Sequence, residues 1–334
     1  MGFENDKRFQ LAVLVTAINM MKTVTTPVLN KVFSRKKPQL TDVFEWEIKS
    51  GSLGLLDNIA VEAPATVADK TDRKIVTCKG PRYAEKRFIP ASFFNQLKGF
   101  GTNQAGQLLS EKISDEQFDM KGKIDRTREF QAIKAIQGKV VDKKGNTIVD
   151  YNFAGDQKVT LAGDAVWDSE LSDPILNLRS WKKTIARALG YTPSYAAFCG
   201  SGAMDCLIAN KSILDKLKYT KGGMLADQGR IASLAGVTIE ENFGYYKDDD
   251  GTVHEMIPEN AFILVGLAPE ATGELYAPVV DLEAPTGVGK NKKAQVFFSK
   301  SWKKDDPSGR WIKVESRPLP VLFNPGCIVV ATVK

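Results

Sequence analysis

The stretch Arg128-Glu-Phe-Gln-Ala-Ile-Lys-Ala-Ile-Gln-Gly-Lys-Val-Val-Asp142 joins the end of a helical pattern to the start of a hairpin. From Leu109 onward, apolar residues recur at helical spacing with charged residues between them, which predicts a helix over about 104–140. At about 1.5 Å per residue, roughly 30 helical residues extend on the order of 45 Å. Because this length exceeds the diameter of a small domain, we expect a spine that lies along a flat structure.

Downstream of the spine, the sequence predicts a hairpin over 139–151 and then a compact α/β unit from Ser172. Asp173 is a favourable N-cap, Pro174 suits the first helical position, and Gly190 would stop the helix at 189. Further elements are expected as strands at Tyr195–Cys199, Gly236–Glu240, Asn260–Gly266, Ala294–Ser299, Trp311–Ser316 and Cys327–Val333, with a helix at Ala203–Lys218. This mixed order favours an α+β fold over a regular βαβ repeat.

Upstream of the spine, residues 41–90 contain two extended pieces joined by small, proline-bearing and charged residues. Val61–Lys70 forms much of the joining segment, and Arg73–Lys79 contains a β-favouring Ile-Val pair. The segment has few large apolar side chains, so it cannot form a core by itself. An ordered loop of this length is uncommon in a compact domain, and we expect residues 47–88 to lie mainly over an adjacent subunit.

Positive charge is concentrated at the N-terminus. Residues 1–40 carry seven basic and two acidic groups, a net charge of +5, whereas the whole chain has a formal net charge of +6. Such an arm contacts nucleic acid or a neighbouring acidic surface, unless it is simply a solvated run of lysines. The apolar run Leu11–Ile18 predicts a short helix that docks on the body or on another subunit. Acidic residues precede this run and no cleavage site follows it, which argues against a secretory signal.

The composition is that of a globular protein of about two domains, with 334 residues of which 43% are hydrophobic and 26% charged. No run of about 18 apolar residues would span a membrane. The four cysteines are scattered without C-x-x-C spacing, and His254 is the single histidine of the sequence. These residues form neither a disulfide framework nor a zinc set, and we expect reduced thiols.

Motifs for catalysis or cofactor binding occur only as incomplete matches. Ala284–Asn291 is similar to a phosphate-binding loop but lacks the first glycine and the hydroxyl that binds Mg²⁺. Asp248–Gly251 is similar to a calcium loop, but Tyr246 and Ile257 would stand where carboxylates are required, so a hairpin turn is predicted. No nucleophile, base and orienting group can be assembled around His254. We therefore expect no enzyme, no catalytic residue, no cofactor and no metal.

Several blocks of sequence resemble the major capsid proteins of tailed bacteriophages, specifically the lambda-type major head protein family with the Hong Kong 97-like fold. Arg128–Asp142 and its hairpin are similar to the spine helix of that family and the turn after it. Thr238–Tyr246 and Met256–Gly266, on either side of the Asp-Gly turn, resemble a second block of the family. Lys300–Pro307 and Val314–Leu322 resemble its C-terminal block, so the resemblance covers nearly the whole chain.

The resemblance implies a particular α+β architecture, the Hong Kong 97-like capsid fold. Its parts are an N-terminal arm, an extended β-hairpin loop, a peripheral domain with a long spine helix, and an axial α/β domain. The expected boundaries are 1–45 for the arm, 46–90 for the extended loop, 91–171 for the peripheral domain, 172–310 for the axial domain, and 311–334 for C-terminal strands that return to the body.

The resemblance also implies a function. The chain would be a major capsid protein that self-assembles, as pentamers and hexamers, into an icosahedral shell around phage double-stranded DNA. The implied partners are a separately encoded scaffolding protein, a portal protein, DNA on the inner face and, optionally, a decoration or cementing protein, with no membrane. Assembly would take place in the host bacterial cytoplasm. Two alternatives stay open: an encapsulin-like nanocompartment shell, and a non-shell protein that binds nucleic acid through its basic arm.

Candidate assembly residues follow from the basic arm, the loop and the spine motif. They are Arg35, Lys36, Lys37, Lys70, Arg73, Lys74, Arg128 and Glu129. Some capsids of this fold join a loop lysine covalently to an asparagine of a neighbour, for which this chain offers Lys70, Lys74 or Lys79 and Asn324. No motif connects these residues, and lambda-type relatives use a cementing protein instead, so we expect no cross-links.

Overall fold

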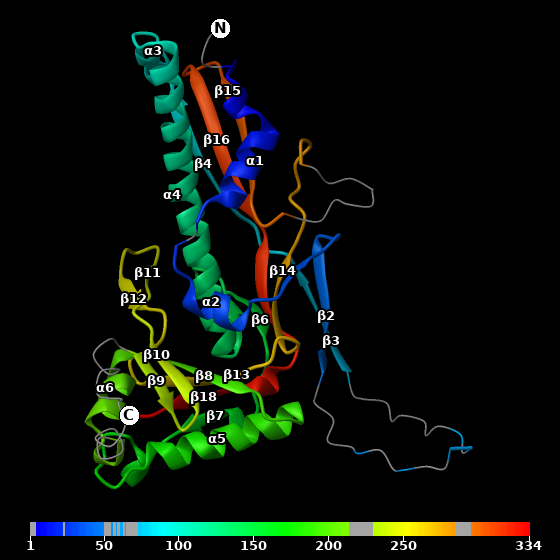
Figure 1. The fold of residues 1–334 in the computed structure, drawn as a ribbon, viewed down its shortest axis with the longest axis vertical. Coiled ribbons are helices and arrows are strands. Elements are labelled where there is room, and N and C mark those ends of the chain that lie inside the picture. The colour runs from blue at the N-terminus through cyan, green and yellow to red at the C-terminus, as the bar shows by residue number, and fades with distance from the viewer. Residues whose placement is uncertain are drawn as a thin grey trace.

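The structure is a computed structural model of the chain. It describes residues 5–22, 24–49, 73–213, 230–284 and 295–334, together with the single positions 55, 58, 61, 62 and 64. A long helix follows the upper part of the longest axis, and an α/β unit forms the lower end (Figure 1).

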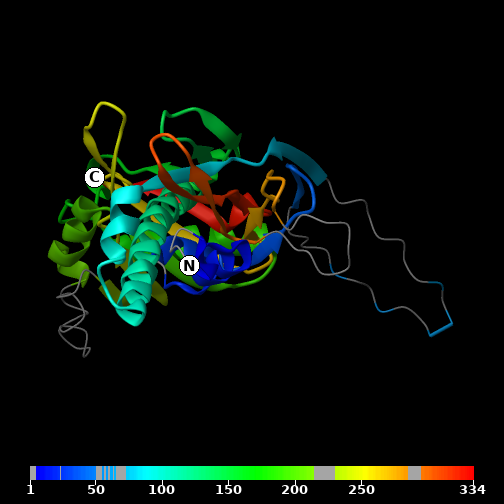
Figure 2. The same ribbon diagram turned by 90° about the horizontal axis from the view of Figure 1, so that it is seen from above.

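The upper part is built on the spine helix α4, Thr102–Ile136, which packs on a three-stranded antiparallel sheet. The sheet has the order β15-β16-β4, with β15 at Phe298–Lys304, β16 at Gly309–Ser316 and β4 at Tyr83–Pro90. The arm helix α1, Leu11–Met20, lies on the same side of these strands as α4 (Figure 2), and α3, Ala91–Leu97, leads from β4 to α4. One apolar cluster between the helices and the sheet includes Leu14, Ile18, Ile89, Leu109, Met120 and Ile312. The predicted spine is therefore present, and the apolar helix of the arm docks on the body of its own chain.

The lower part is a six-stranded mixed sheet with the order β7-β18-β13-β8-β10-β9. Its strands are β7 Lys158–Thr160, β18 Ile328–Thr332, β13 Ala261–Leu267, β8 Ser194–Cys199, β10 Val237–Glu241 and β9 Arg230–Leu234. The central strands β13 and β8 are buried along nearly their whole length, as their continuous apolar sequences require. The helices α5, Pro174–Leu189, and α6, Ser201–Ala209, both contact β13.

The bounds of α5 follow from local signals in the sequence. The Asp173 carboxylate accepts a hydrogen bond from the N–H of Ile175 at 2.9 Å, and Pro174 occupies the first helical position. Gly190 ends the helix with a φ of 83°, a left-handed conformation that favours glycine. The prediction of a helix capped at Asp173 and stopped by Gly190 is confirmed.

A third sheet joins the upper and lower parts. It has the order β1-β14-β17, with β1 at Lys36–Pro38, β14 at Thr272–Tyr276 and β17 at Pro318–Leu322. The helix α2, Pro27–Val32, precedes β1 and packs on α4. Beside this sheet, β2, Val43–Lys49, and β3, Arg73–Lys79, form an antiparallel pair, which we call the ribbon (Figure 1).

Two predicted hairpins are present. The first pairs β5, Lys139–Val141, with β6, Thr147–Asp150, and the second pairs β11, Tyr245–Lys247, with β12, Val253–Glu255. The Asp-Gly turn of the second hairpin has a φ of 86° at Gly251, as expected for this turn chemistry. Short 3-10 helices complete the described elements at Lys7–Phe9, Gly155–Gln157, Gly163–Ala165 and Pro325–Cys327.

The extended loop is shorter than predicted. We expected it over 46–90, but residues 83–90 form β4, which pairs along its length with β16 and buries Ile89. The ribbon also begins at Val43, inside the segment that we had assigned to the arm. The reason is that the partner of β4 lies near the C-terminus, so nearby sequence could not show that this strand belongs to the body.

Other predicted boundaries are also crossed by strands. β7 lies in the segment expected to be peripheral (91–171) but joins the six-stranded sheet, and β15 leaves the segment expected to be axial (172–310) for the upper sheet. The spine ends at Ile136, earlier than predicted, because Gly138 takes a φ of 105° and Lys139 begins β5. Sheets made from distant segments therefore do not follow divisions drawn along the chain.

Some predictions fall partly or wholly outside the described residues. The helix expected at 203–218 is described as α6 to Ala209, and residues 214–229 lie outside the description. The strand expected at 294–299 corresponds to β15, which begins at Phe298. Residues 285–291 of the segment similar to a phosphate loop, and Lys70, also lie outside the described residues.

Candidate assembly site

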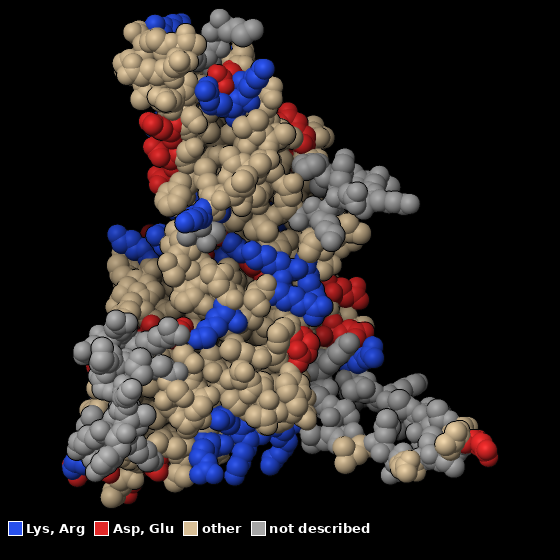
Figure 3. Space-filling model, viewed as in Figure 1, with Lys and Arg blue, Asp and Glu red and all other residues tan. Residues whose placement is uncertain are grey.

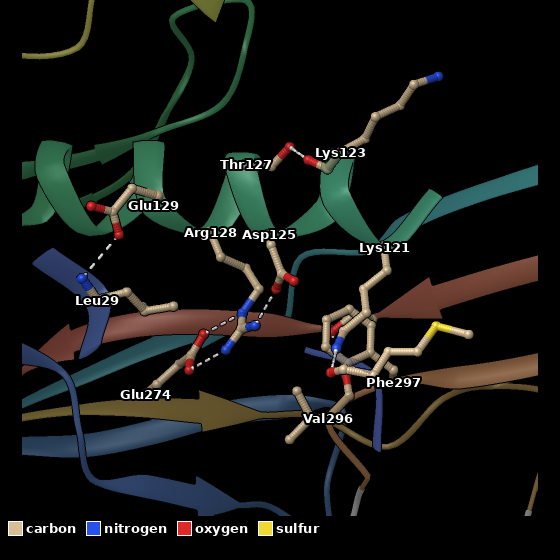
Figure 4. Close-up of polar contacts among 12 residues, drawn as sticks. Leu29, Lys121, Lys123, Asp125, Thr127, Arg128, Glu129, Glu274, Val296 and Phe297 are labelled. Carbon is tan, nitrogen blue, oxygen red and sulfur yellow. Dashed lines mark hydrogen bonds and ion pairs between the residues drawn. The ribbon is translucent and has the colours of Figure 1, made fainter. Parts of the chain in front are cut away.

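Arg128 is a predicted assembly residue with a buried side chain, 3% exposed, on α4. Its Nε and Nη2 donate to the two carboxylate oxygens of Glu274 on β14 at 2.9 and 2.8 Å (Figure 4). Its Nη1 donates to Oδ1 of Asp125 at 2.5 Å, and Nη2 also donates to the hydroxyl of Tyr276 at 2.6 Å. One guanidinium therefore binds two buried carboxylates and joins the spine to the central sheet.

Burial and pairing act in opposite directions on this cluster. Burial raises the pKa of the Asp125 carboxyl, and the neighbouring Arg128 opposes that rise. Burial disfavours the charged form of Arg128 and so lowers its pKa. The carboxylate of Glu274 has a larger effect in the opposite direction and holds the pKa of Arg128 above its usual value. Removing one partner of such a buried pair costs about 3–5 kcal/mol because an unpaired charge stays behind. The cluster therefore fixes β14 against α4.

Glu129, the next predicted residue, caps a helix from the arm. Its carboxylate accepts hydrogen bonds from the N–H groups of Val28 at 2.9 Å and Leu29 at 3.0 Å, which open α2. Figure 4 shows the bond to Leu29. Thr26, the N-cap residue of α2, makes no side-chain cap of its own. Burial raises the pKa of Glu129 to about 7, although the two backbone hydrogen bonds oppose that rise. The spine thus supplies the cap that the local sequence of α2 lacks.

Two further spine residues, which sequence reasoning missed, also hold the arm. The Gln117 side-chain amide donates to the backbone carbonyl of Leu14 at 3.2 Å, and Lys121 Nζ donates to that of Met21 at 2.7 Å. The two contacts join residues 103 and 100 positions apart, respectively. The sequence cannot show which backbone carbonyl accepts a hydrogen bond. The available signal was that Gln117 and Lys121 are polar residues on the buried side of the spine helix.

The predicted basic cluster Arg35, Lys36 and Lys37 lies on and beside β1. β1 runs parallel to β14, and the carbonyl of Arg35 accepts a hydrogen bond from the N–H of Glu274 at 2.8 Å. Lys37 Nζ lies 3.9 Å from the ring centroid of Phe323, a cation–π contact, whereas Arg35 and Lys36 are exposed. The structure therefore brings this cluster to the same strand that Arg128 binds.

The predicted loop residues lie apart from the buried pair on the spine. Arg73 Nη1 lies 3.2 Å from a carboxylate oxygen of Glu47 across the ribbon, and Lys74 is exposed. Lys70 lies outside the described residues. Arg73 and Lys74 thus belong to the ribbon and not to the cluster around Arg128.

Arg317, which the sequence did not predict, holds the base of the ribbon. It is 4% exposed, its Nη2 donates to the carbonyl of Gly80 at 2.8 Å, and its Nη1 donates to that of Pro278 at 2.9 Å. The same guanidinium forms an ion pair with Asp42. Its signal in the sequence was a lone arginine within the largely apolar stretch 314–322.

A cleft of about 650 Å³ lies beside these elements and is lined by residues of β1, the ribbon and the segment after α5. Arg35 and Lys37 line it, together with three carboxylates, Glu45, Glu47 and Glu270. The predicted arm cluster and the ribbon therefore face a shared surface of mixed charge.

Metal sites, membrane-spanning helices and reactive thiols each place requirements on the described residues. In that part of the chain, no three His, Cys, Asp or Glu side chains are grouped as metal ligands, and no helix is long and apolar enough to cross a bilayer. The four cysteines have free thiols, and burial raises the pKa of Cys327 to about 12. His254 Nε2 lies 2.8 Å from a carboxylate oxygen of Asp248 on the exposed β11–β12 hairpin.

The sequence profile of a family described as phage major capsid protein E matches residues 10–333. The chain belongs to this family. It is a shell-forming major capsid protein and a structural protein of the bacteriophage virion. The match favours neither the nanocompartment nor the non-shell DNA-binding alternative. None of the curated proteins in the comparison matches the sequence.

Solved structures show the fold of this capsid protein. A prophage protein of Escherichia coli CFT073 described as a capsid protein has a TM-score of 0.67 at 17% identity, over 97% of this chain and 99% of that chain. A subunit of the mature capsid of bacteriophage PhiM1 has a TM-score of 0.54 at 11% identity, over 94% and 88% of the two chains. A capsid chain of cyanophage P-SCSP1u also has a TM-score of 0.54, at 9% identity over 93% and 89%. The α+β, Hong Kong 97-like capsid fold is confirmed.

Proposed function

We propose that this major capsid protein assembles as pentamers and hexamers into an icosahedral shell that encloses phage double-stranded DNA. Assembly takes place in the host bacterial cytoplasm with a separately encoded scaffolding protein and a portal protein. A decoration protein is an optional later partner. The chain acts as a building block and carries out no catalytic step.

The ribbon is the observation that carries this proposal. Arg317 holds its base, and Trp46, which is 5% exposed, packs in the core of the subunit. Ile75 and Val43 on its strands are nevertheless 59% and 45% exposed. A two-stranded ribbon is at best marginally stable alone, and its apolar side chains gain from contact with another surface. In a shell made of one chain, that surface is a neighbouring copy, reached by a heterologous contact that propagates around a ring.

The domains and the candidate residues take their roles from this arrangement. The ribbon with the segment 50–72 is the extended loop, α4 with the β15-β16-β4 sheet is the peripheral domain, and the six-stranded sheet with α5 and α6 is the axial domain. Arg128 and Glu129 hold the arm and β14 in place within one subunit. The remaining candidates contact neighbouring subunits, and these are Arg35, Lys36, Lys37, Lys70, Arg73 and Lys74.

Cryo-electron microscopy of particles purified from bacteria that produce the phage tests the proposal. The expected map is a closed shell in which the six-stranded sheets gather around five-fold and six-fold positions and each ribbon lies over an adjacent subunit. Particles whose shell is made of another chain would refute the proposal. A shell whose ribbons stay on their own subunits would refute the role of the extended loop.

A further inference from the structure

The outer face of α5 carries a line of positive charge. The helix has four basic residues and no acidic one among its sixteen. Arg179, Lys183 and Arg187 are exposed and four positions apart, so they form one stripe with a spacing of about 6 Å. The opposite face packs on the sheet through Leu178, Trp181, Ile185 and Leu189.

The charges of this stripe have no partner within the described part of the chain. None of the three side chains forms an ion pair or a hydrogen bond with another described residue. The fourth base of the helix, Lys182, differs because its Nζ donates to the carbonyl of Ala235 at 2.9 Å. Lys and Arg side chains gather along the lower edge of the molecule, where α5 lies, without acidic groups between them (Figure 3).

The arm, which holds most of the net charge of the sequence, is different. Arg8 pairs with Asp6 at 2.9 Å, and Lys31 pairs with Glu240 of β10 at 3.1 Å. Lys37 lies over an aromatic ring of its own subunit. Part of the positive charge in the arm is therefore used inside the subunit, whereas the α5 stripe remains available to an anionic partner.

The three basic residues of the stripe do not stabilise α5. Like charges four positions apart on a helix repel one another and destabilise it. Only Arg187, in the last turn, gains from the helix dipole. The stability of α5 comes instead from its buried apolar face and its cap, so the basic face is better explained by binding.

We propose that Arg179, Lys183 and Arg187 contact the phosphate backbone of the enclosed double-stranded DNA, with α5 facing the interior of the shell. This inference rests on the proposed function. Double-stranded DNA carries one negative charge per about 1.7 Å of its axis, so three cations spaced along α5 extend past several phosphate charges. Arginine and lysine bind phosphates without reading sequence, as a shell around a whole genome requires.

The chemistry of the stripe favours DNA over a protein partner. The core of a protein interface is apolar and depleted of charged residues. Leu176, at the start of the helix, is the single large apolar side chain among the exposed positions of α5, and the others are Arg179, Ser180, Lys183 and Arg187. The stripe therefore fits a polyanion such as DNA better than the core of a protein interface.

Binding of the purified full-length protein to double-stranded DNA of random sequence tests the inference. The variant is Arg179→Gln with Lys183→Gln and Arg187→Gln, and the control, Arg35→Gln with Lys36→Gln and Lys37→Gln, removes the same charge from the arm. The slope of log K against log salt falls by about 0.9 for each phosphate that the protein no longer neutralises. The α5 variant should therefore reduce the slope by about 2.7, while the control keeps the wild-type slope.

Urea unfolding shows whether each variant is folded. The three α5 substitutions are exposed and should leave the midpoint unchanged, whereas the control also loses the contact of Lys37 with Phe323 and should lower the midpoint slightly. An α5 variant that keeps the wild-type slope overturns the inference, and so does an equal reduction of the slope in the α5 variant and the arm control. A variant that binds DNA normally but no longer forms shells would make the stripe a contact between subunits and would also overturn it. If the wild-type chain binds DNA through α5 but forms no shell, the proposed function fails and the DNA contact stands.

Discussion

Arg128 and Arg126 lie two positions apart on α4 but have opposite environments. Arg128 is buried between Glu274 and Asp125, whereas Arg126 is exposed. Arg128→Met leaves two buried carboxylates without their cation, and we expect the free energy of unfolding to fall by about 3–5 kcal/mol. Arg126→Met, the matched control, should change it by less than about 0.5 kcal/mol. Urea unfolding followed by tryptophan fluorescence measures both, and equal losses would show that the buried cluster does not hold the fold.

Glu129 should make the stability of the subunit depend on pH near neutrality. Burial raises its pKa from a usual value near 4.5 to about 7, so the folded state holds this proton more tightly than the unfolded chain does. Its contribution to stability is therefore complete below about pH 4.5 and is lost as the pH rises through 7. A shift of this size corresponds to about 3 kcal/mol.

Substitution separates Glu129 from the other titrating groups. Between pH 5 and pH 8, the wild-type chain should lose about 2–3 kcal/mol more unfolding free energy than Glu129→Gln, which cannot ionise. Glu111→Gln, on an exposed position of the same helix, should keep the wild-type pH dependence. Urea unfolding at the two pH values provides the measurement, and an unchanged pH dependence in Glu129→Gln would assign the effect to other groups.

At the scale of single residues, the sequence singled out Arg128 and Glu129 but could not predict which groups they bind. Arg128 and Glu129 were named because they stand in the spine motif, and the structure shows that both are buried and bonded. Their partners could not be predicted, because Glu274 is 146 positions away from Arg128 and a backbone N–H has no sequence signature. Arg317 was missed for the same reason, since two of its acceptors are backbone carbonyls.

Among the elements, α5 and β4 show where sequence reasoning succeeds and where it fails. The start, end and buried face of α5 are set by residues within the helix or next to it, so they could be read locally. β4 has an alternating burial pattern, but its place in the fold depends on β16, which ends more than 200 residues later. A strand without its partner could be assigned equally to the loop or to the body, and strands of this kind cross the predicted domain boundaries.

The ribbon can be tested as an element because its base is held separately from the segment beyond it. Removing residues 51–71 and joining the ends with a short Gly-Ser linker retains β2, β3 and the contacts of Arg317. Shortening a loop changes its closure entropy only slightly, so the unfolding free energy should stay within about 1 kcal/mol of the wild-type value. Without its reach over a neighbour, the folded protein should no longer close shells. Electron microscopy measures the outcome, and normal particles would show that assembly does not need the extended loop.

At the scale of the whole molecule, the last part of the chain connects the three larger sheets. β16, β17 and β18 follow one another in sequence, yet each joins a different sheet: the upper sheet, the joining sheet and the six-stranded sheet. The spine and the axial part are therefore united by non-local pairings that form only when the C-terminus is in place. Such pairings are slow to form, because the entropy of closing long loops must be overcome first.

The same C-terminal segment contains Asn324, the candidate acceptor of a covalent cross-link between subunits. The side chain of Asn324 is hydrogen-bonded within its own subunit. Its Oδ1 accepts a hydrogen bond from the N–H of Gly326 at 3.0 Å. Its Nδ2 also donates to the carbonyl of Ala188 at 3.4 Å, and a loop lysine would have to displace these contacts. Lys74 and Lys79 are exposed on β3, and no described contact directs either toward Asn324.

We therefore predict that mature particles contain no lysine–asparagine cross-links. After boiling in denaturant, the capsid protein should migrate as one band at the monomer mass of 36.7 kDa, and a ladder of higher masses would contradict the prediction. Without covalent bonds, the shell must resist the pressure of its contents through non-covalent contacts alone. Each subunit should then bury far more than the about 1,600 Å² of a standard pairwise interface, summed over its neighbours. The same cryo-electron microscopy map that places the ribbons measures this area, and a smaller value would require a cementing partner to supply the remaining contacts.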